Sequence, residues 1–157
     1  MEDGTHESTQ HPGRRAAPPA GAGGRAAGRW HLEVEHHLSS VPRARHWVVQ
    51  RCAAAGVPAA VLTVVELLTA ELTANAVLHG APPVRLDLER TAEGVRVAVG
   101  DADPSPPVRR SVGPEATGGR GVALVDLLSG AWGVEEHAGG KTVWFTLVVT
   151  APPATAG

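Results

Sequence analysis

The residues from Pro58 to Gly80 read PAAVLTVVELLTAELTANAVLHG and predict the longest helix of the chain. Apolar side chains recur along this stretch at three- and four-residue spacing, so that one side of the helix is apolar. That side consists of Val61, Val65, Leu68, Leu72 and Ala76. Proline suits the start of a helix and glycine is a common stop. The pattern therefore predicts a helix over 58–80 whose apolar side is buried in a core.

Two elements are expected before this helix. In residues 31–38 apolar and polar side chains alternate, which is typical of a half-buried strand. Ser40 can cap a following helix in which Pro42 occupies the first turn, and Gly56 is its stop signal. The sequence thus predicts a strand over 31–38 and a helix over 41–55.

Two hairpins are expected after the long helix. Short alternating runs at 84–88 and 95–99 flank Thr91-Ala92-Glu93-Gly94, which suits a tight turn. The end of the chain repeats the pattern, with strands at 131–137 and 141–149 around Ala138-Gly139-Gly140. Strands joined in this way lie antiparallel in one sheet.

The segment between the hairpins has a different character. Residues 100–121 are rich in glycine and proline and predict a long loop, of the kind that is often functional. A short helix is expected over 121–128, ending near Gly130. This order of elements has too few strand-helix-strand crossovers for a parallel sheet. The expected fold is an α+β two-layer sandwich, a mostly antiparallel sheet covered on one face by helices. The other face is wet, with polar side chains at Glu33, Glu35, Arg85, Asp87 and Arg96.

Length and composition indicate one soluble domain. The chain has 157 residues, and 15 of the first 29 are Gly, Ala or Pro. We therefore expect a disordered leader at 1–29, a folded domain at 30–150 and a disordered tail at 151–157. No uninterrupted apolar run approaches the ~20 residues that cross a bilayer, and the acidic start lacks a secretory signal. The expected location is the cytoplasm, with no membrane attachment.

Charge and rare residues exclude several functions. The net charge of −2 gives no basic field for nucleic acid, and aromatic residues are too few for stacking platforms. The single cysteine, Cys52, cannot form an internal disulfide and reads as a small buried thiol. No zinc-binding spacing is formed by His31, His36, His37 and His46.

Glu71 and Asn75 are the first candidate site residues. Four residues apart in a helix, they share one face about one turn apart and can meet the same ligand. An amide oxygen suits Mg²⁺ already held by phosphates, and a carboxylate can accept a proton or orient water. The pair taken alone is equally an exposed, polar stretch of helix.

Three further candidates lie downstream. Asp101 follows the strand at 95–99, where its carboxylate can accept a bond from an exocyclic amine or simply form a turn. Gly118-Gly119-Arg120-Gly121 precedes the short helix, so its backbone amides and the Arg120 guanidinium can meet phosphate, or the glycines can merely cap the helix. Gly139-Gly140-Lys141-Thr142 is by itself a hairpin turn.

In this order the four pieces resemble the nucleotide-binding boxes of the GHKL, or histidine-kinase-like, ATPase superfamily. The chain is most similar to its small bacterial regulators of the anti-sigma-factor serine/threonine kinase type, over about residues 39–148. Three stretches carry the resemblance, namely ELTANAVLHG at 71–80, TGGRGVALV at 117–125 and GKTVW at 140–144. The resemblance implies the Bergerat-type ATP-binding fold, with a lid loop at about 102–118.

The resemblance also implies roles for single residues. Asn75 would coordinate Mg²⁺, Glu71 would be the base or orient water, and Asp101 would bind the adenine amine. Gly118, Gly119 and Gly121 would lie against the phosphates, Arg120 would face the γ-phosphate or a bound protein, and Thr142 would support the adenine. His79 matches the end of the first box, with either a structural or a ligand role.

The implied function is that of an ATP-dependent protein kinase. Such a kinase phosphorylates a serine of an anti-anti-sigma partner, can sequester a sigma factor, and commonly forms a homodimer. One departure favours an alternative, because the family's Asp-x-Gly-x-Gly box reads Asp101-Ala102-Asp103-Pro104-Ser105 here. The alternative is an ATP-gated protein-binding module with little or no phosphotransfer.

Two further points bear on these functions. Asp103 is either a turn residue or a second acid of the site. A sensor histidine kinase is disfavoured, since no dimerisation hairpin is visible before residue 40.

Overall fold

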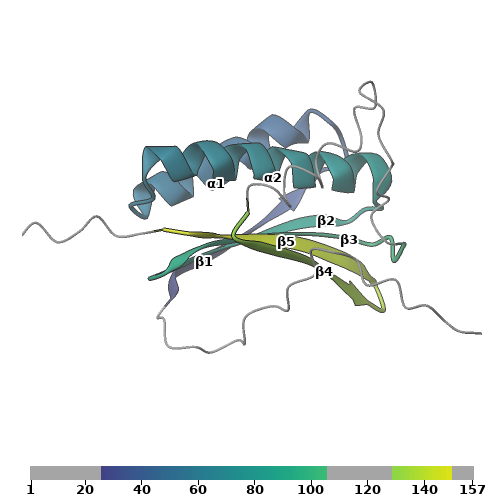
Figure 1. Ribbon diagram of the computed structural model, residues 1–157. Helices are drawn as coiled ribbons and strands as arrows, with labels where there is room; N and C mark the ends of the chain where they lie inside the picture. The colour runs from purple at the N-terminus through teal and green to yellow at the C-terminus, as the bar shows by residue number, and fades with distance from the viewer. Residues whose placement is uncertain (1–25, 106–128, 150–157) are drawn as a thin grey trace, which may run out of the picture.

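The computed structural model describes residues 26–105 and 129–149 (Figure 1). Two helices lie together on one face of a five-stranded antiparallel sheet whose strand order is β1-β2-β3-β5-β4. This arrangement confirms the α+β two-layer sandwich expected from the sequence. The expected leader up to residue 25, the tail, most of the lid loop and the helix over 121–128 fall outside the described residues.

The two helices form where the sequence predicts them. Helix α1 spans Ser40–Ala54 and helix α2 spans Ala59–His79, the latter bounded by Pro58 and Gly80. The start of α1 differs in one detail, because Ser40 is a buried residue inside the helix instead of its cap. Ser39 holds the capping position and makes no side-chain cap bond.

Helix α2 is long and apolar enough, by length and composition alone, to cross a membrane. Its buried side explains this composition, since residues such as Leu68 and Leu72 belong to the same core as the sheet. A core helix and a spanning helix pass the same test of composition. The apolar side predicted from the spacing is the side that packs in this core.

The five strands form two hairpins and one added edge strand. Their bounds are β1 Ala26–Val34, β2 Val84–Thr91, β3 Gly94–Asp101, β4 Ala131–His137 and β5 Gly140–Val148. Strands β2 and β3 pair antiparallel, as do β4 and β5, so both predicted hairpins are confirmed. The two hairpins join through the pairing of β3 with β5.

Strand β1 departs from the prediction at both ends. It begins at Ala26 and ends at Val34, whereas alternation predicts 31–38, so residues 26–29 belong to a strand and not to the leader. The physical reason is pairing, because β1 runs beside β2 as far as Thr91 and gains a ladder of backbone hydrogen bonds. An ion pair between Arg29 and Glu89 accompanies this pairing.

The sheet has one apolar face and one charged face. Leu88, Val97 and Phe145 are neighbours across three strands and are almost fully buried against the helices. The opposite face carries ion pairs between neighbouring strands (Arg29–Glu89 and His31–Asp87), along one strand (Arg85–Asp87) and from β3 to β4 across the intervening β5 (Arg96–Glu135). Trp144 is on this face as well, with the Arg96 guanidinium 5.3 Å from its ring centre. The polar face expected from Arg85, Asp87 and Arg96 is therefore confirmed.

Candidate functional site

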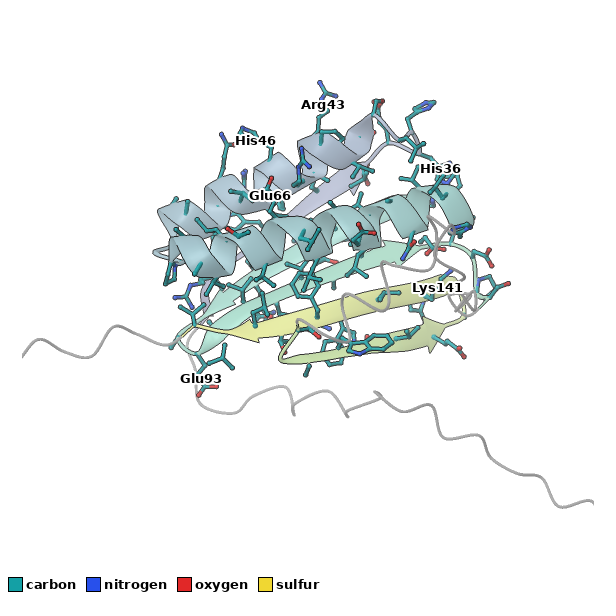
Figure 2. The ribbon with its side chains drawn as sticks, turned by 45° about the horizontal axis from the view of Figure 1, so that its top comes forward. His36, Arg43, His46, Glu66, Glu93 and Lys141 are labelled. Carbon is teal, nitrogen blue, oxygen red and sulfur yellow. The ribbon has the colours of Figure 1, made fainter. Side chains whose placement is uncertain are left out.

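Three distant segments of the chain meet at one end of the sheet. They are the C-terminal end of α2, the end of β3 at Asp101 and the start of β5. Asp101 pairs with Lys141 across the two strands, and the Ala102 N–H donates to the carbonyl of Ala81, just after α2, at 2.8 Å. Figure 2 places Lys141 at this end of the sheet, far from Glu93 in the turn between β2 and β3. This end is the place where the predicted site residues can converge.

The Asp101 carboxylate lies at the centre of this junction. Its side chain is 3% exposed, and its Oδ1 atom accepts three hydrogen bonds. The donors are the Ala81 N–H at 3.3 Å, the Asp103 N–H at 2.8 Å and the Lys141 ammonium at 3.2 Å. Among the described residues no donor bonds to Oδ2. One carboxylate oxygen is thus fully occupied, and the other is left to accept a bond from a ligand.

Two glycines allow the backbone to approach Asp101. A Cβ atom on Gly80 would lie 2.5 Å from Cγ of Asp101 and 2.5 Å from the backbone oxygen of Ala76. A Cβ atom on Gly140 would lie 1.9 Å from the Asp101 carbonyl oxygen, and Gly140 has a φ of +148°. Only glycine fits at either position without a backbone shift. Asp101 therefore lies close against the end of α2 through its carboxylate and against the β4–β5 turn through its backbone carbonyl.

Lys141 is a site residue that the sequence reading did not single out. Its ammonium bonds to Asp101 Oδ1 and, at 3.0 Å, to the carbonyl oxygen of Asp103, and its side chain is only 7% exposed. A buried lysine needs partners of this kind, because an unpaired charge is costly away from water. The signal for it was present in the sequence. Lys141 shares the two-residue period of the core residues Val143 and Phe145, so it points to the helix-covered face.

Asp103 forms a turn beside the site. Its carboxylate accepts a bond from the Ser105 N–H at 2.9 Å, and this bond holds the pKa of Asp103 below its usual value. Its own N–H donates to Asp101. Of the two roles open to Asp103, the structure supports the turn residue. Side chains thus shape the segment from 101 to 105 without the glycines of the family's box.

Glu71 and Asn75 lie one turn apart on α2, upstream of the junction. Both side chains are half-buried, and between them Leu72 and Thr73 face the interior. Neither Glu71 nor Asn75 has a hydrogen-bond partner in the parts of the chain that the structure describes. His79 is exposed at the end of the helix, where a basic side chain suits the helix dipole. The carboxylate and the amide are therefore available to a ligand.

Thr142 lies on the other face of the sheet from Asp101. It is paired with Gly100 and alternates with Val143, and its hydroxyl is 3.2 Å from Nε2 of His137. The residue beside Asp101 is Lys141, and Thr142 has no bond to Asp101. Gly118, Gly119, Arg120 and Gly121 fall outside the described residues, so their place at the site stays a prediction.

Two buried hydroxyls accompany the site on α2. Thr69 and Thr73 are 0% exposed, and their Oγ1 atoms have no hydrogen-bond partner within residues 26–105 and 129–149. Threonine in a helix often bonds to the carbonyl four residues earlier, as exposed Thr63 does to Ala59 at 3.2 Å. The two buried hydroxyls are thus a local cost to stability.

The chain belongs to the histidine kinase-like ATPase domain family, whose model matches residues 34–147. No curated protein matches it. A similar solved structure is the crystal structure of the RsbU and RsbW domains of Rv1364c from Mycobacterium tuberculosis, with a TM-score of 0.60 and 19% identity. The similarity covers 80% of this chain and 33% of that chain, so this chain spans about a third of its relative's length. At this identity the likeness confirms the fold.

Membership of this family implies ATP, usually with Mg²⁺, and the residues at the junction fit that ligand. Oδ2 of Asp101, which no described residue binds, is an acceptor suited to an exocyclic amine, and Gly80 and Gly140 let the backbone come close to Asp101. The amide of Asn75 and the carboxylate of Glu71, which have no partner among the described residues either, supply oxygen atoms on the helix nearby. The described part of the chain holds no group of three His, Cys, Asp or Glu side chains able to bind a metal alone.

Proposed function

We propose that this protein is an ATP-binding regulator of the anti-sigma-factor kinase type, which phosphorylates a serine of an anti-anti-sigma partner. The observation that carries the proposal is the buried Asp101, with one oxygen saturated and the other without a donor in the described part of the chain, beside a helix that presents Glu71 and Asn75. The family membership supports ATP as the ligand. Sequestration of a sigma factor by the same protein is part of the proposal.

Asp101 and Asn75 have separate roles in this proposal. Asp101 accepts a bond from the adenine amine through Oδ2, and Asn75 ligates Mg²⁺ through its amide oxygen. Mg²⁺ keeps several waters and phosphate oxygens as ligands, so one neutral protein oxygen is a sufficient contribution. Gly118, Gly119, Gly121 and Arg120 would contact the phosphates.

Glu71 is proposed as the catalytic base. When bound, Mg·ATP supplies the phosphoryl group that the serine oxygen takes up, with ADP as the leaving group. Glu71 accepts the proton of the serine hydroxyl, and its half-buried carboxylate, unpaired among the residues that the structure describes, is suited to this role. Transfer of the proton to Glu71 balances the step.

A second function is favoured by the segment after Asp101. Asp103, Pro104 and Ser105 replace the flexible family box, and Lys141 ties the Asp103 carbonyl to β5. A segment fixed in this way suits a module that binds ATP in order to dock a partner, with little phosphotransfer. Both functions require the same nucleotide site, so the partner protein distinguishes them.

The binding site is tested first by calorimetry. Asn75→Ala should abolish Mg·ATP binding while leaving the fold intact, because the side chain makes no bond within the described residues. The matched control is Gln50→Ala, a truncation at an exposed position on α1. Undiminished affinity of Asn75→Ala would exclude the proposed metal ligand.

Catalysis is tested with labelled ATP and a cell extract of the source organism. Wild-type protein should label one small protein on serine, whereas Glu71→Gln should bind ATP as well as wild type and label nothing. Equal labelling by both proteins would remove Glu71 as the base. Binding without labelling by either protein would support the ATP-gated module.

A further inference from the structure

We infer that Lys141 is a positioning residue that makes Asp101 selective for the exocyclic amine of adenine. The inference rests on the proposed function, since it assigns a cause to the base specificity of the same site. Lys141 acts through Asp101, because it holds the carboxylate in the orientation in which Oδ2 faces the ligand.

The first step is the distribution of hydrogen bonds on Asp101. Oδ1 accepts from the Ala81 N–H, the Asp103 N–H and the Lys141 ammonium, while Oδ2 accepts from no donor within residues 26–105 and 129–149. A carboxylate oxygen has two lone pairs, so three donors saturate Oδ1. The group that faces the ligand is therefore the acceptor Oδ2, with no free backbone donor beside it, and an amine can donate a hydrogen bond to this oxygen.

The second step is the position of the ammonium. Lys141 is 7% exposed and is held at two points, Asp101 Oδ1 and the Asp103 carbonyl oxygen, so its charge cannot swing away into water. The Lys141 bonds span 40 and 38 residues of sequence and join β5 to the segment after β3. Because the two backbone donors bond to the same oxygen atom as the ammonium, the three together fix the rotation of the carboxylate.

The third step compares Lys141 with the other cations near the sheet. Arg85 pairs with Asp87 at 3.4 Å, but its side chain is 58% exposed and lies on the charged face. Arg29 and Arg96 are likewise on that face. Among the ion pairs of the described residues, Lys141–Asp101 alone has both side chains buried. In a buried ion pair at a ligand site, the fixed positions of the charged atoms determine most strongly which ligand groups can bind.

The consequence is a difference between nucleotides. ATP carries the amine, and purine riboside triphosphate carries hydrogen at the same position. Without the amine this charge-assisted hydrogen bond is lost, so wild type should bind purine riboside triphosphate about tenfold or more weakly than ATP. The ratio of the two dissociation constants measures the selectivity for the amine. Removal of Lys141 leaves Oδ1 with its two neutral backbone donors and takes away the charged one, so the carboxylate is held less firmly and this ratio should fall below about threefold.

The experiment measures the affinity of both nucleotides, with Mg²⁺, for wild type and four variants by calorimetry. Lys141→Met removes the ammonium, Lys141→Gln keeps the length and a polar end, and Lys141→Arg keeps the charge. Arg85→Met is the control for loss of an exposed cation. We expect the ratio to collapse in Lys141→Met and Lys141→Gln and to persist in Lys141→Arg and Arg85→Met.

The outcomes separate this inference from the proposed function. Equal weakening of both nucleotides in Lys141→Met or Lys141→Gln, with the ratio unchanged, would show that Lys141 only stabilises the fold and would overturn the inference. A wild-type ratio near one, with ATP bound, would overturn it as well and leave the ATP site standing. A wild-type protein that binds no ATP would overturn the proposed function and the inference together. Lys141→Gln serves in place of Lys141→Met if the latter does not fold.

Discussion

At the scale of single residues, Gly80 is the position with least room at the site. The Cβ atom of Gly80→Ala would lie 2.5 Å from Asp101 Cγ and from the Ala76 carbonyl oxygen, both held firmly in the fold. Such overpacking costs roughly 1–3 kcal/mol of the free energy of unfolding. Urea unfolding should show this loss for Gly80→Ala. Gly139→Ala is the control, because nothing lies within 4 Å of its Cβ and its stability should stay within about 0.5 kcal/mol of wild type.

Cys52 provides a prediction of pH dependence. Burial raises the pKa of its thiol from 9.0 to about 11, so the folded protein keeps the proton that the unfolded chain releases. The stabilisation is fully present below pH 9 and is lost as the pH rises toward 11, by roughly 2–3 kcal/mol. Unfolding free energies at pH 8.5 and 10.5 should show a larger fall for wild type than for Cys52→Ala. Equal falls would mean that the thiol does not titrate in this range.

Residue patterns predicted where part of this candidate site lies and missed another part, and the roles of the predicted residues stay predictions. Glu71 and Asn75 could be found because a helix places residues four apart on one face, whatever the rest of the fold does. The bonds to Asp101 join residues 20 and 40 positions apart, so they depend on strand pairing that local patterns do not encode. Lys141 was within reach of the alternation in β5, which places it on the same face as Val143 and Phe145.

At the scale of elements, α2 carries both the site residues and an internal weakness. The hydroxyls of Thr69 and Thr73 are fully buried and have no partner in the described parts of the chain. Thr69→Val keeps the shape and removes the unsatisfied group, so it should stabilise the protein by about 1 kcal/mol. In thermal unfolding, the midpoint temperature of Thr69→Val should be a few degrees higher than that of wild type. Thr63→Val, at an exposed hydroxyl that already bonds to Ala59, should change little. A destabilised Thr69→Val would show that the hydroxyl has a partner such as a buried water.

The predicted elements differ in how far their bounds depend on the local sequence alone. Helix α2 and both hairpins follow from residue periods and turn residues, so their bounds agree closely with the sequence reading. Strand β1 begins with Ala-Ala-Gly-Arg, which has no alternation, and its start at Ala26 depends on pairing with β2. Its end at Val34 leaves Glu35 and His36 outside the sheet although they continue the alternation.

At the scale of the whole molecule, one core joins both helices to the sheet. Residues from α1, α2 and strands β1, β2, β3 and β5 belong to the same buried cluster. Such a domain should unfold in a single cooperative step. Tryptophan fluorescence reports from Trp30, Trp47, Trp132 and Trp144, which lie on four different elements, and far-UV circular dichroism reports on the backbone. The two signals should give the same urea midpoint, and two separate midpoints would contradict a single unit.

The turn between β2 and β3 has a practical use. It is built by Thr91, whose hydroxyl accepts bonds from the N–H groups of Glu93 and Gly94, and Ala92 and Glu93 are exposed. Since this turn and Lys141 lie at opposite ends of the sheet (Figure 2), a fluorescent dye attached at Ala92 would report on tumbling and complex formation without touching the nucleotide. With the native Cys52 buried and poorly reactive, Ala92→Cys would offer a single labelling handle for anisotropy titrations with partner proteins.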